Sequence, residues 1–178
     1  IHNPVSGETI VIRTSAAETG GRLLVWELRL APRGKVPSGH THPGQEERFT
    51  VREGRMRFRV GGRTRVVGPG ETVVVPPGTA HHFANAGRVP ARAEVETRPA
   101  LRMEELLRTA AEMSRGRRGP LRALPRPVDL MLFMREFRAE VTAPYLPARL
   151  VRVVVDAVSW CAEKVGADRH YRRSGHRC

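Results

Sequence analysis

The feature that most constrains the fold is a set of three histidines and one glutamate spread from residue 40 to residue 81. His40, His42 and Glu47 lie close together in the sequence, and His81 follows much later, after the turn at 76–78. Three imidazoles and one carboxylate suit a first-row transition metal that keeps coordination positions open. Side chains alternate between the faces of a strand, so His40 and His42 point to the same side. Glu47 can return to that side on the next strand, and His81 must come from a strand that the fold brings close.

Two longer patterns with glycines at their ends contain these residues. The first is G-x5-H-x-H-x4-E-x6-G from Gly34 to Gly54, and the second is G-x5-P-x-G-x2-H-x3-N from Gly70 to Asn85. They fill every fixed position of the two motifs of the cupin superfamily, and the chain resembles a single-domain cupin over residues 5–98. The resemblance implies a small antiparallel β-barrel of the jelly-roll type. It also implies one metal ion inside the barrel, held by His40, His42, Glu47 and His81.

The strand patterns favour an all-β fold independently of the resemblance. Met56, Phe58 and Val60 alternate with three arginines, and turn residues separate several short segments of this kind. The pattern alone predicts an all-β sandwich or barrel, and together with the resemblance it predicts a jelly-roll barrel over residues 1–98. The predicted strands span residues 9–14, 22–31, 47–52, 55–60, 63–67, 72–75 and 91–98, and a further strand carries His81 and Phe83 and closes at Asn85 and Gly87.

The same alternation predicts which side chains point into the barrel. If Glu47 faces a metal ion inside, Phe49 and Val51 have the same parity and also line the interior. The apolar residues expected there form either the wall of a substrate pocket or ordinary core packing, and the pattern leaves both open. They are Trp26, Phe49, Val51, Met56, Phe58 and Phe83.

Some neighbours of the predicted ligands have simpler interpretations. Glu46 is expected to be a surface acid and is the second-choice metal ligand. His82 is expected on the outward face. Asn85 is expected to be structural, because asparagine caps turns through its own side chain. A degenerate barrel that has lost its metal is the alternative interpretation of the whole cluster.

After Pro99 the hydrophobic period changes to that of a helix. We predict helices over residues 101–113, 128–141 and 148–165, a linker at 114–127 and a basic tail at 169–178, so residues 99–178 form a helical extension. The third predicted helix is apolar on more than one side. It is expected to pack on the barrel or on a second chain, which predicts a homodimer. Cys161, within it, is expected to be a small buried hydrophobe.

Composition limits the partners and the location. The net charge is +13, and all but two of the 31 basic residues are arginine. This charge is shared between the two halves of the chain, whereas nucleic-acid-binding proteins usually concentrate it on one element, so nucleic-acid binding is not favoured. The basic tail is compatible with an anionic membrane surface or an acidic partner. No signal peptide or membrane-spanning run is evident, and two cysteines predict no disulfide framework, so we expect a cytoplasmic protein.

The cupin superfamily includes dioxygenases, isomerases, decarboxylases, sugar-modifying enzymes and binding proteins, so the fold cannot select the activity. We expect one divalent ion, with Fe, Mn, Ni, Zn or Cu all admissible. The apolar interior favours a small organic substrate with an aromatic or enol part. Comparison with quercetin-type dioxygenases predicts a metal-dependent oxygenase in which Glu47 is a ligand or the catalytic base. The alternatives are a non-enzymatic module that binds a small ligand or a partner, and a metal-dependent isomerase.

Overall fold

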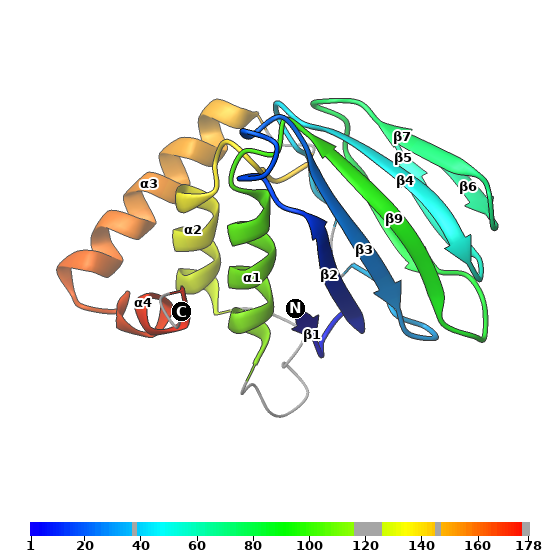
Figure 1. Ribbon diagram of the computed structural model, residues 1–178. Coiled ribbons are helices and arrows are strands. Elements are labelled where there is room, and N and C mark those ends of the chain that lie inside the picture. The colour runs from blue at the N-terminus through cyan, green and yellow to red at the C-terminus, as the bar shows by residue number, and fades with distance from the viewer. Residues whose placement is uncertain (37–38, 116–125, 145–146, 176–178) are drawn as a thin grey trace.

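The protein folds into two antiparallel β-sheets followed by a group of helices (Figure 1). The computed structural model describes residues 1–36, 39–115, 126–144 and 147–175. The larger sheet has the strand order β1-β2-β3-β9-β4-β7, and the smaller sheet has the order β6-β5-β8. The strands are β1 His2–Asn3, β2 Glu8–Thr14, β3 Leu24–Leu30, β4 Glu46–Glu53, β5 Met56–Val60, β6 Arg63–Val67, β7 Thr72–Val75, β8 His81–Asn85 and β9 Ala91–Arg98.

The hydrophobic core lies between the two sheets, as the alternating pattern predicts. On β3 the even-numbered residues from Leu24 to Leu30 are buried, and on β4 Phe49 and Val51 are fully buried beside Glu47. The Phe49 ring lies 5.1 Å from that of Phe58 and 5.3 Å from that of Phe83, measured between centroids. Burying each such aromatic side chain contributes roughly 1.5–3 kcal/mol to folding. The prediction of an all-β jelly-roll core is confirmed.

Two motif residues hold the ends of the strands in place. Gly54 has φ +70°, and a Cβ there would lie 2.7 Å from the carbonyl oxygen of Pro90, so no larger residue fits without a shift of the backbone. The Asn85 amide nitrogen lies 3.1 Å from the carbonyl oxygens of Leu30 and Ala31 and 2.8 Å from that of Val89. Asn85 therefore joins the end of β8 to the loops beside β3 and β9, which confirms its structural role.

The helices lie beside the sandwich, next to β1 and β2 (Figure 1). They are α1 Met103–Ser114, α2 Pro127–Glu136, α3 Ala148–Lys164 and α4 Arg169–Gly175. Met103 and Leu106 of α1, together with Phe137 after α2, join the core cluster of the sandwich. Helix α3 packs against α2 and lies furthest from the sheets. Within the described residues, no helix is both long enough and apolar enough to cross a membrane.

The structure corrects three details of the predicted extension. The second helix ends at Glu136 instead of residue 141, because Phe137 leaves helical geometry and buries its ring in the core. The predicted basic tail begins with helix α4. Cys161 is exposed, because it lies on the outer face of α3. Most of the predicted linker, residues 116–125, lies outside the described residues.

A buried carboxylate on the outer face of β3 contacts three arginines, one each from β2, β3 and β9. Glu27 is only 6% exposed. Its oxygens lie 2.8 Å from Arg13 Nη2, 2.6 Å from Arg29 Nε and 3.5 Å from Arg92 Nη1. The hydrogen bonds from Arg13 and Arg29 lower the pKa of Glu27 to about 2, and burial acts weakly in the opposite direction.

The Glu27 network predicts a pH-dependent contribution to stability. A carboxyl group with a lowered folded-state pKa stabilises the fold above its unfolded value of 4.5, and this contribution is lost as pH falls toward about 2. Glu27→Gln should therefore lower the free energy of unfolding by about 1 kcal/mol at neutral pH. In urea titrations the difference from the parent protein should shrink below pH 4.5.

Glu94→Gln is the matched control for this experiment. Glu94 pairs with Arg52 at 2.9 Å, but both side chains are more than 40% exposed, so its loss should change stability much less. A Glu27→Gln deficit that stays constant from neutral pH to pH 3, or that Glu94→Gln equals, would contradict the assignment.

Candidate metal centre

The fold brings together all four residues that the sequence selects as metal ligands. One potential ligand atom from each of His40, His42, Glu47 and His81 lies within 4.8 Å of the others. Glu47 is on β4 of the larger sheet, and His81 begins β8 of the smaller sheet. His40 pairs with His81 as an isolated antiparallel bridge, with N–O distances of 3.0 and 2.9 Å. The cluster therefore lies between the sheets, where the two motifs meet.

The carboxylate of Glu47 is the common neighbour of two imidazoles. Its Oε2 lies 3.1 Å from His81 Nε2 and 3.4 Å from His42 Nε2. The three imidazole centroids are 4.3 to 5.3 Å apart. All the available donors are nitrogen or oxygen, which is the chemistry that divalent transition metals accept. The residues present therefore fit a metal ion.

Backbone carbonyls orient two of the imidazoles. His42 Nδ1 lies 2.5 Å from the carbonyl oxygen of Glu140, and His81 Nδ1 lies 3.2 Å from that of Thr79. When Nδ1 donates its proton to these oxygens, Nε2 keeps its lone pair and faces the cluster. Metal-binding histidines are usually held by such a hydrogen bond from the nitrogen that does not bind the metal. This arrangement favours metal binding over a cluster of merely packed histidines.

The electrostatics of the cluster favour an ionised carboxylate. Burial alone would raise the pKa of Glu47, but the charges and hydrogen bonds of His42 and His81 lower it well below its ordinary value. Burial acts to lower the pKa of His42, and the Glu47 carboxylate with the Glu140 carbonyl raises it overall. Glu47 is thus an anion near neutral pH, which is the form that binds a cation.

Access to the cluster differs from ligand to ligand. His42, Glu47 and His81 are at most 4% exposed, whereas His40 is half-buried. Of the four cluster residues, His40 is therefore the most exposed. The Phe49 ring, 6.5 Å from that of His81, adjoins the cluster from the core. The six residues expected to line the interior are all buried in this core, and their role as the lining of a ligand pocket stays a prediction.

Two other acidic residues near the cluster were not identified from the sequence. Glu140 acts through its backbone carbonyl, 98 residues after His42 in the sequence, and no sequence pattern indicates such a contact. On β2, Glu8 lies two residues before the buried Ile10, so strand alternation predicts that both side chains point to the same face. Burial and the charge of Glu47 raise the pKa of Glu8, against a hydrogen bond from the Ser6 hydroxyl. Glu46 and His82 lie outside the four-residue cluster.

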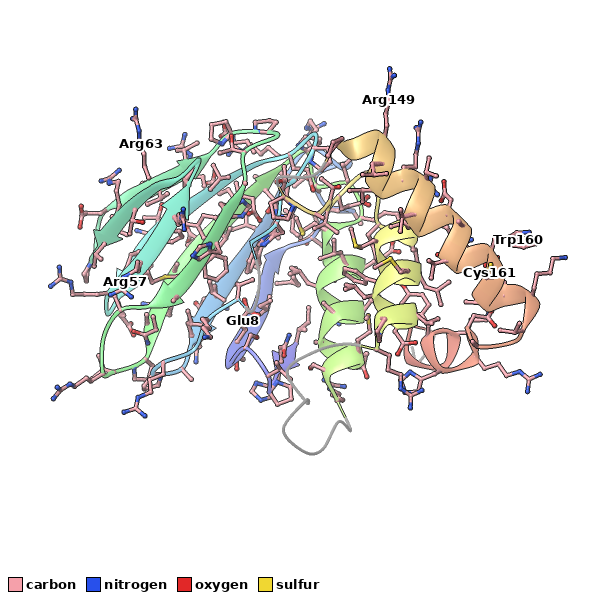
Figure 2. The ribbon with its side chains drawn as sticks, turned by 180° about the vertical axis from the view of Figure 1, so that it is seen from behind. Glu8, Arg57, Arg63, Arg149, Trp160 and Cys161 are labelled. Carbon is pink, nitrogen blue, oxygen red and sulfur yellow. The ribbon has the colours of Figure 1, made fainter. Side chains whose placement is uncertain are left out.

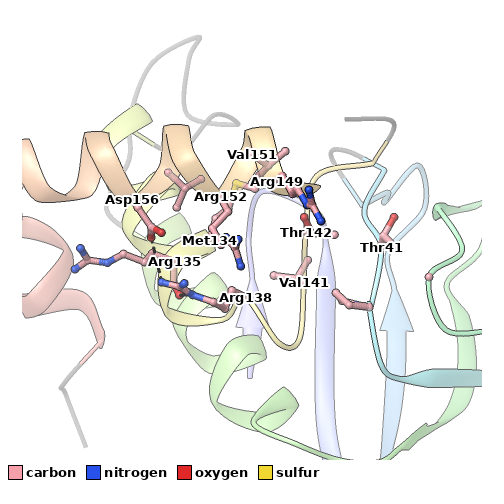
Figure 3. Close-up of a pocket in the computed structure, with 13 residues that line it drawn as sticks. Thr41, Met134, Arg135, Arg138, Val141, Thr142, Arg149, Val151, Arg152 and Asp156 are labelled. Atoms are coloured by element: carbon pink, nitrogen blue, oxygen red, sulfur yellow. Dashed lines mark hydrogen bonds and ion pairs between the residues drawn. The ribbon is translucent and has the colours of Figure 1, made fainter. Parts of the chain in front are cut away.

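A groove runs along the other side of the strand segment that holds His40 and His42 (Figure 3). It encloses about 700 Å³ between this segment, α2 and α3. Thr41 and Thr142, which pair as an isolated bridge, form one wall. The remaining walls combine apolar residues with four arginines, namely Arg135, Arg138, Arg149 and Arg152. None of the four cluster residues lines this groove.

Comparison with known proteins agrees with this geometry. Residues 26–96 match the family model described as the cupin domain. Residues 26–96 are a cupin domain. All four cluster residues and the strands β4 to β8 lie within this match. The comparison with curated proteins found no match.

Solved structures with similar folds carry varied names. One is a predicted oxalate decarboxylase from Thermotoga maritima, with 19% identity and a TM-score of 0.49 over 51% of this chain and 78% of that one. Another is the polyketide cyclase RemF from Streptomyces resistomycificus, with 27% identity and a TM-score of 0.48 over 56% and 70%. A third is a sugar phosphate isomerase of the cupin superfamily from Silicibacter pomeroyi, with 25% identity and a TM-score of 0.44 over 50% and 59%.

Removing one imidazole should weaken metal binding specifically. His81→Ala deletes the only ligand from β8, so its affinity for a divalent ion such as Ni²⁺ should fall about 100-fold or more in calorimetric titration. His82→Ala is the matched control, because His82 is the next residue and lies outside the cluster. Equal affinities for His81→Ala and the parent protein would exclude this centre.

Proposed function

We propose that the cupin domain binds one divalent transition-metal ion and uses it as a metal-dependent oxygenase of a small organic substrate. The observation that carries the proposal is the convergence of three imidazoles and one carboxylate within 4.8 Å. The carbonyls of Glu140 and Thr79 orient two of the imidazoles. The assembled cluster therefore supports a resident cofactor.

The four residues would supply two kinds of ligand to that ion. His40, His42 and His81 supply neutral nitrogen donors, and Glu47 supplies the negative charge. Fe, Mn, Ni, Zn and Cu all accept this set, and a bound ion would supply Lewis acidity and, for Fe, Mn or Cu, redox chemistry. Because its pKa is held low, Glu47 is better suited to binding a cation than to accepting a proton.

The surroundings of the cluster favour an apolar substrate. Phe49 adjoins His81, and Phe58 and Phe83 pack against Phe49. The arginines of β4 and β5 alternate with these inward-facing residues and are exposed. A sugar phosphate would require convergent cations, whereas an aromatic or enol compound fits apolar walls.

A non-enzymatic function is the second candidate. Three of the four ligands are almost completely buried, and closed metal sites commonly stabilise a fold without catalysing a reaction. In this case the metal would support a barrel that binds a small ligand or a partner. An isomerase, which needs the metal but not dioxygen, is the remaining alternative.

Oxygen consumption distinguishes these candidates. The Fe, Mn and Ni forms should be incubated with enol and catechol-like compounds, with and without air, while substrate loss and oxygen uptake are followed. The proposal predicts turnover only in air, lost in His81→Ala and retained in His82→Ala.

Other results redirect the assignment. Equal turnover without air would favour an isomerase. Absence of turnover in every metal form, with metal still raising the melting temperature, would favour the non-enzymatic function.

A further inference from the structure

Helix α3 presents an apolar face to solvent. Val153, Trp160 and Val165 are 64%, 59% and 79% exposed. Their neighbours at spacings of three and four residues share this surface, which we call the outer face of α3. Figure 2 shows Trp160 and Cys161 on this outer edge of the molecule. The outer face consists of Leu150, Val153, Val154, Ala157, Val158, Trp160, Cys161 and Val165.

Three polar residues of α3, namely Asp156, Ser159 and Glu163, point toward the rest of the protein instead. Asp156 accepts a hydrogen bond from Arg138 at 3.1 Å, and Glu163 pairs with Arg135 of α2. Ser159 is completely buried on the same inner side. A surface helix ordinarily buries its apolar stripe and exposes its polar one. Of its described residues, α3 buries only Val155, Ser159 and Ala162, and a larger apolar face stays exposed, so the outer face is suited to a second surface.

The charges that accompany the outer face are positive. Arg149 near the beginning of α3 and Lys164 at its end are exposed. Within the described ranges, neither is in an ion pair, and Lys164 Nζ lies 5.7 Å from the centre of the Trp160 ring. Both acids of α3 are neutralised by arginines on the inner side. The outer face therefore combines apolar side chains with free cations at both ends.

We propose that the outer face of α3 binds the surface of an anionic lipid bilayer. An interfacial helix buries Leu, Val and Trp at the boundary of the acyl chains while Lys and Arg contact anionic headgroups. Trp160 with Lys164 beside it matches the pairing of an amphipathic ring with a cation at such a boundary. Helix α3 lies along this surface and does not cross it, in agreement with its length and polarity.

A second copy of the chain fits the outer face less well. A parallel pairing of two α3 helices would place Arg149 beside Arg149 and Lys164 beside Lys164. An antiparallel pairing would place Arg149 of each copy beside Lys164 of the other. Both arrangements bring like charges together, and the net charge of +13 on each chain adds to the repulsion. An anionic bilayer neutralises the same charges.

The intrinsic fluorescence of the full chain tests the proposal directly. Trp160 is exposed, whereas Trp26 is only 2% exposed and should respond little. Vesicles of equal parts phosphatidylcholine and phosphatidylglycerol should shift the emission to the blue and carry the protein in flotation assays. Vesicles of phosphatidylcholine alone should bind at least about tenfold less. Trp160→Phe should abolish the spectral shift but retain flotation.

Matched substitutions distinguish vesicle binding by the outer face from nonspecific adsorption. Val153→Glu should reduce flotation at least about tenfold, whereas Val89→Glu should not, because Val89 is 61% exposed in the loop before β9. The double variant Arg149→Gln and Lys164→Gln should lose the preference for anionic vesicles. Equal losses in Val153→Glu and Val89→Glu, or equal binding to neutral vesicles, would overturn the proposal. A third result would also overturn it. If light scattering gives a doubled mass that Val153→Glu abolishes, and the protein does not bind vesicles, the outer face binds a second copy of the chain.

Discussion

The contact between Glu47 and His81 is the interaction on which the structure depends most. Glu47 belongs to the larger sheet and His81 to the smaller one, and 3.1 Å separates Oε2 from Nε2 in the buried interior. A carboxylate buried among Phe49 and its neighbours is costly unless donors or a cation compensate it. The imidazoles supply that compensation at the point where the sheets meet. The buried negative charge of Glu47, which needs compensation inside the apolar core, is thus the same charge that would bind a metal ion.

The helical extension also contributes to this centre. The segment after α2 pairs Thr142 with Thr41, and the Glu140 carbonyl contacts His42. The extension therefore sets the orientation of one ligand, although it lies outside the residues that match the cupin domain. The groove in Figure 3 lies on the other side of the same short strand segment, between the metal centre and α3.

The sequence was sufficient to predict features that depend on local periodicity. Strand parity correctly placed Glu47 with Phe49 inside, and motif spacing correctly grouped His81 with the distant His40. The end of α2 was wrong because the buried position of Phe137 depends on tertiary packing that no local pattern reports. Cys161 was expected inside for a similar reason, since an apolar residue on a helix does not show which face has a partner. The Glu140 carbonyl could not be found, because backbone contacts leave no residue signature.

X-ray absorption at the metal edge of untagged protein tests the central claim most directly. About one metal ion per chain should be present, with a first shell of nitrogen and oxygen and the outer-shell scattering of about three imidazoles. Sulfur in the first shell would instead assign the ion to a cysteine such as the exposed Cys161. Sulfur ligation, or no bound metal even after reconstitution with Fe, Mn, Ni, Zn and Cu, would contradict the assigned centre.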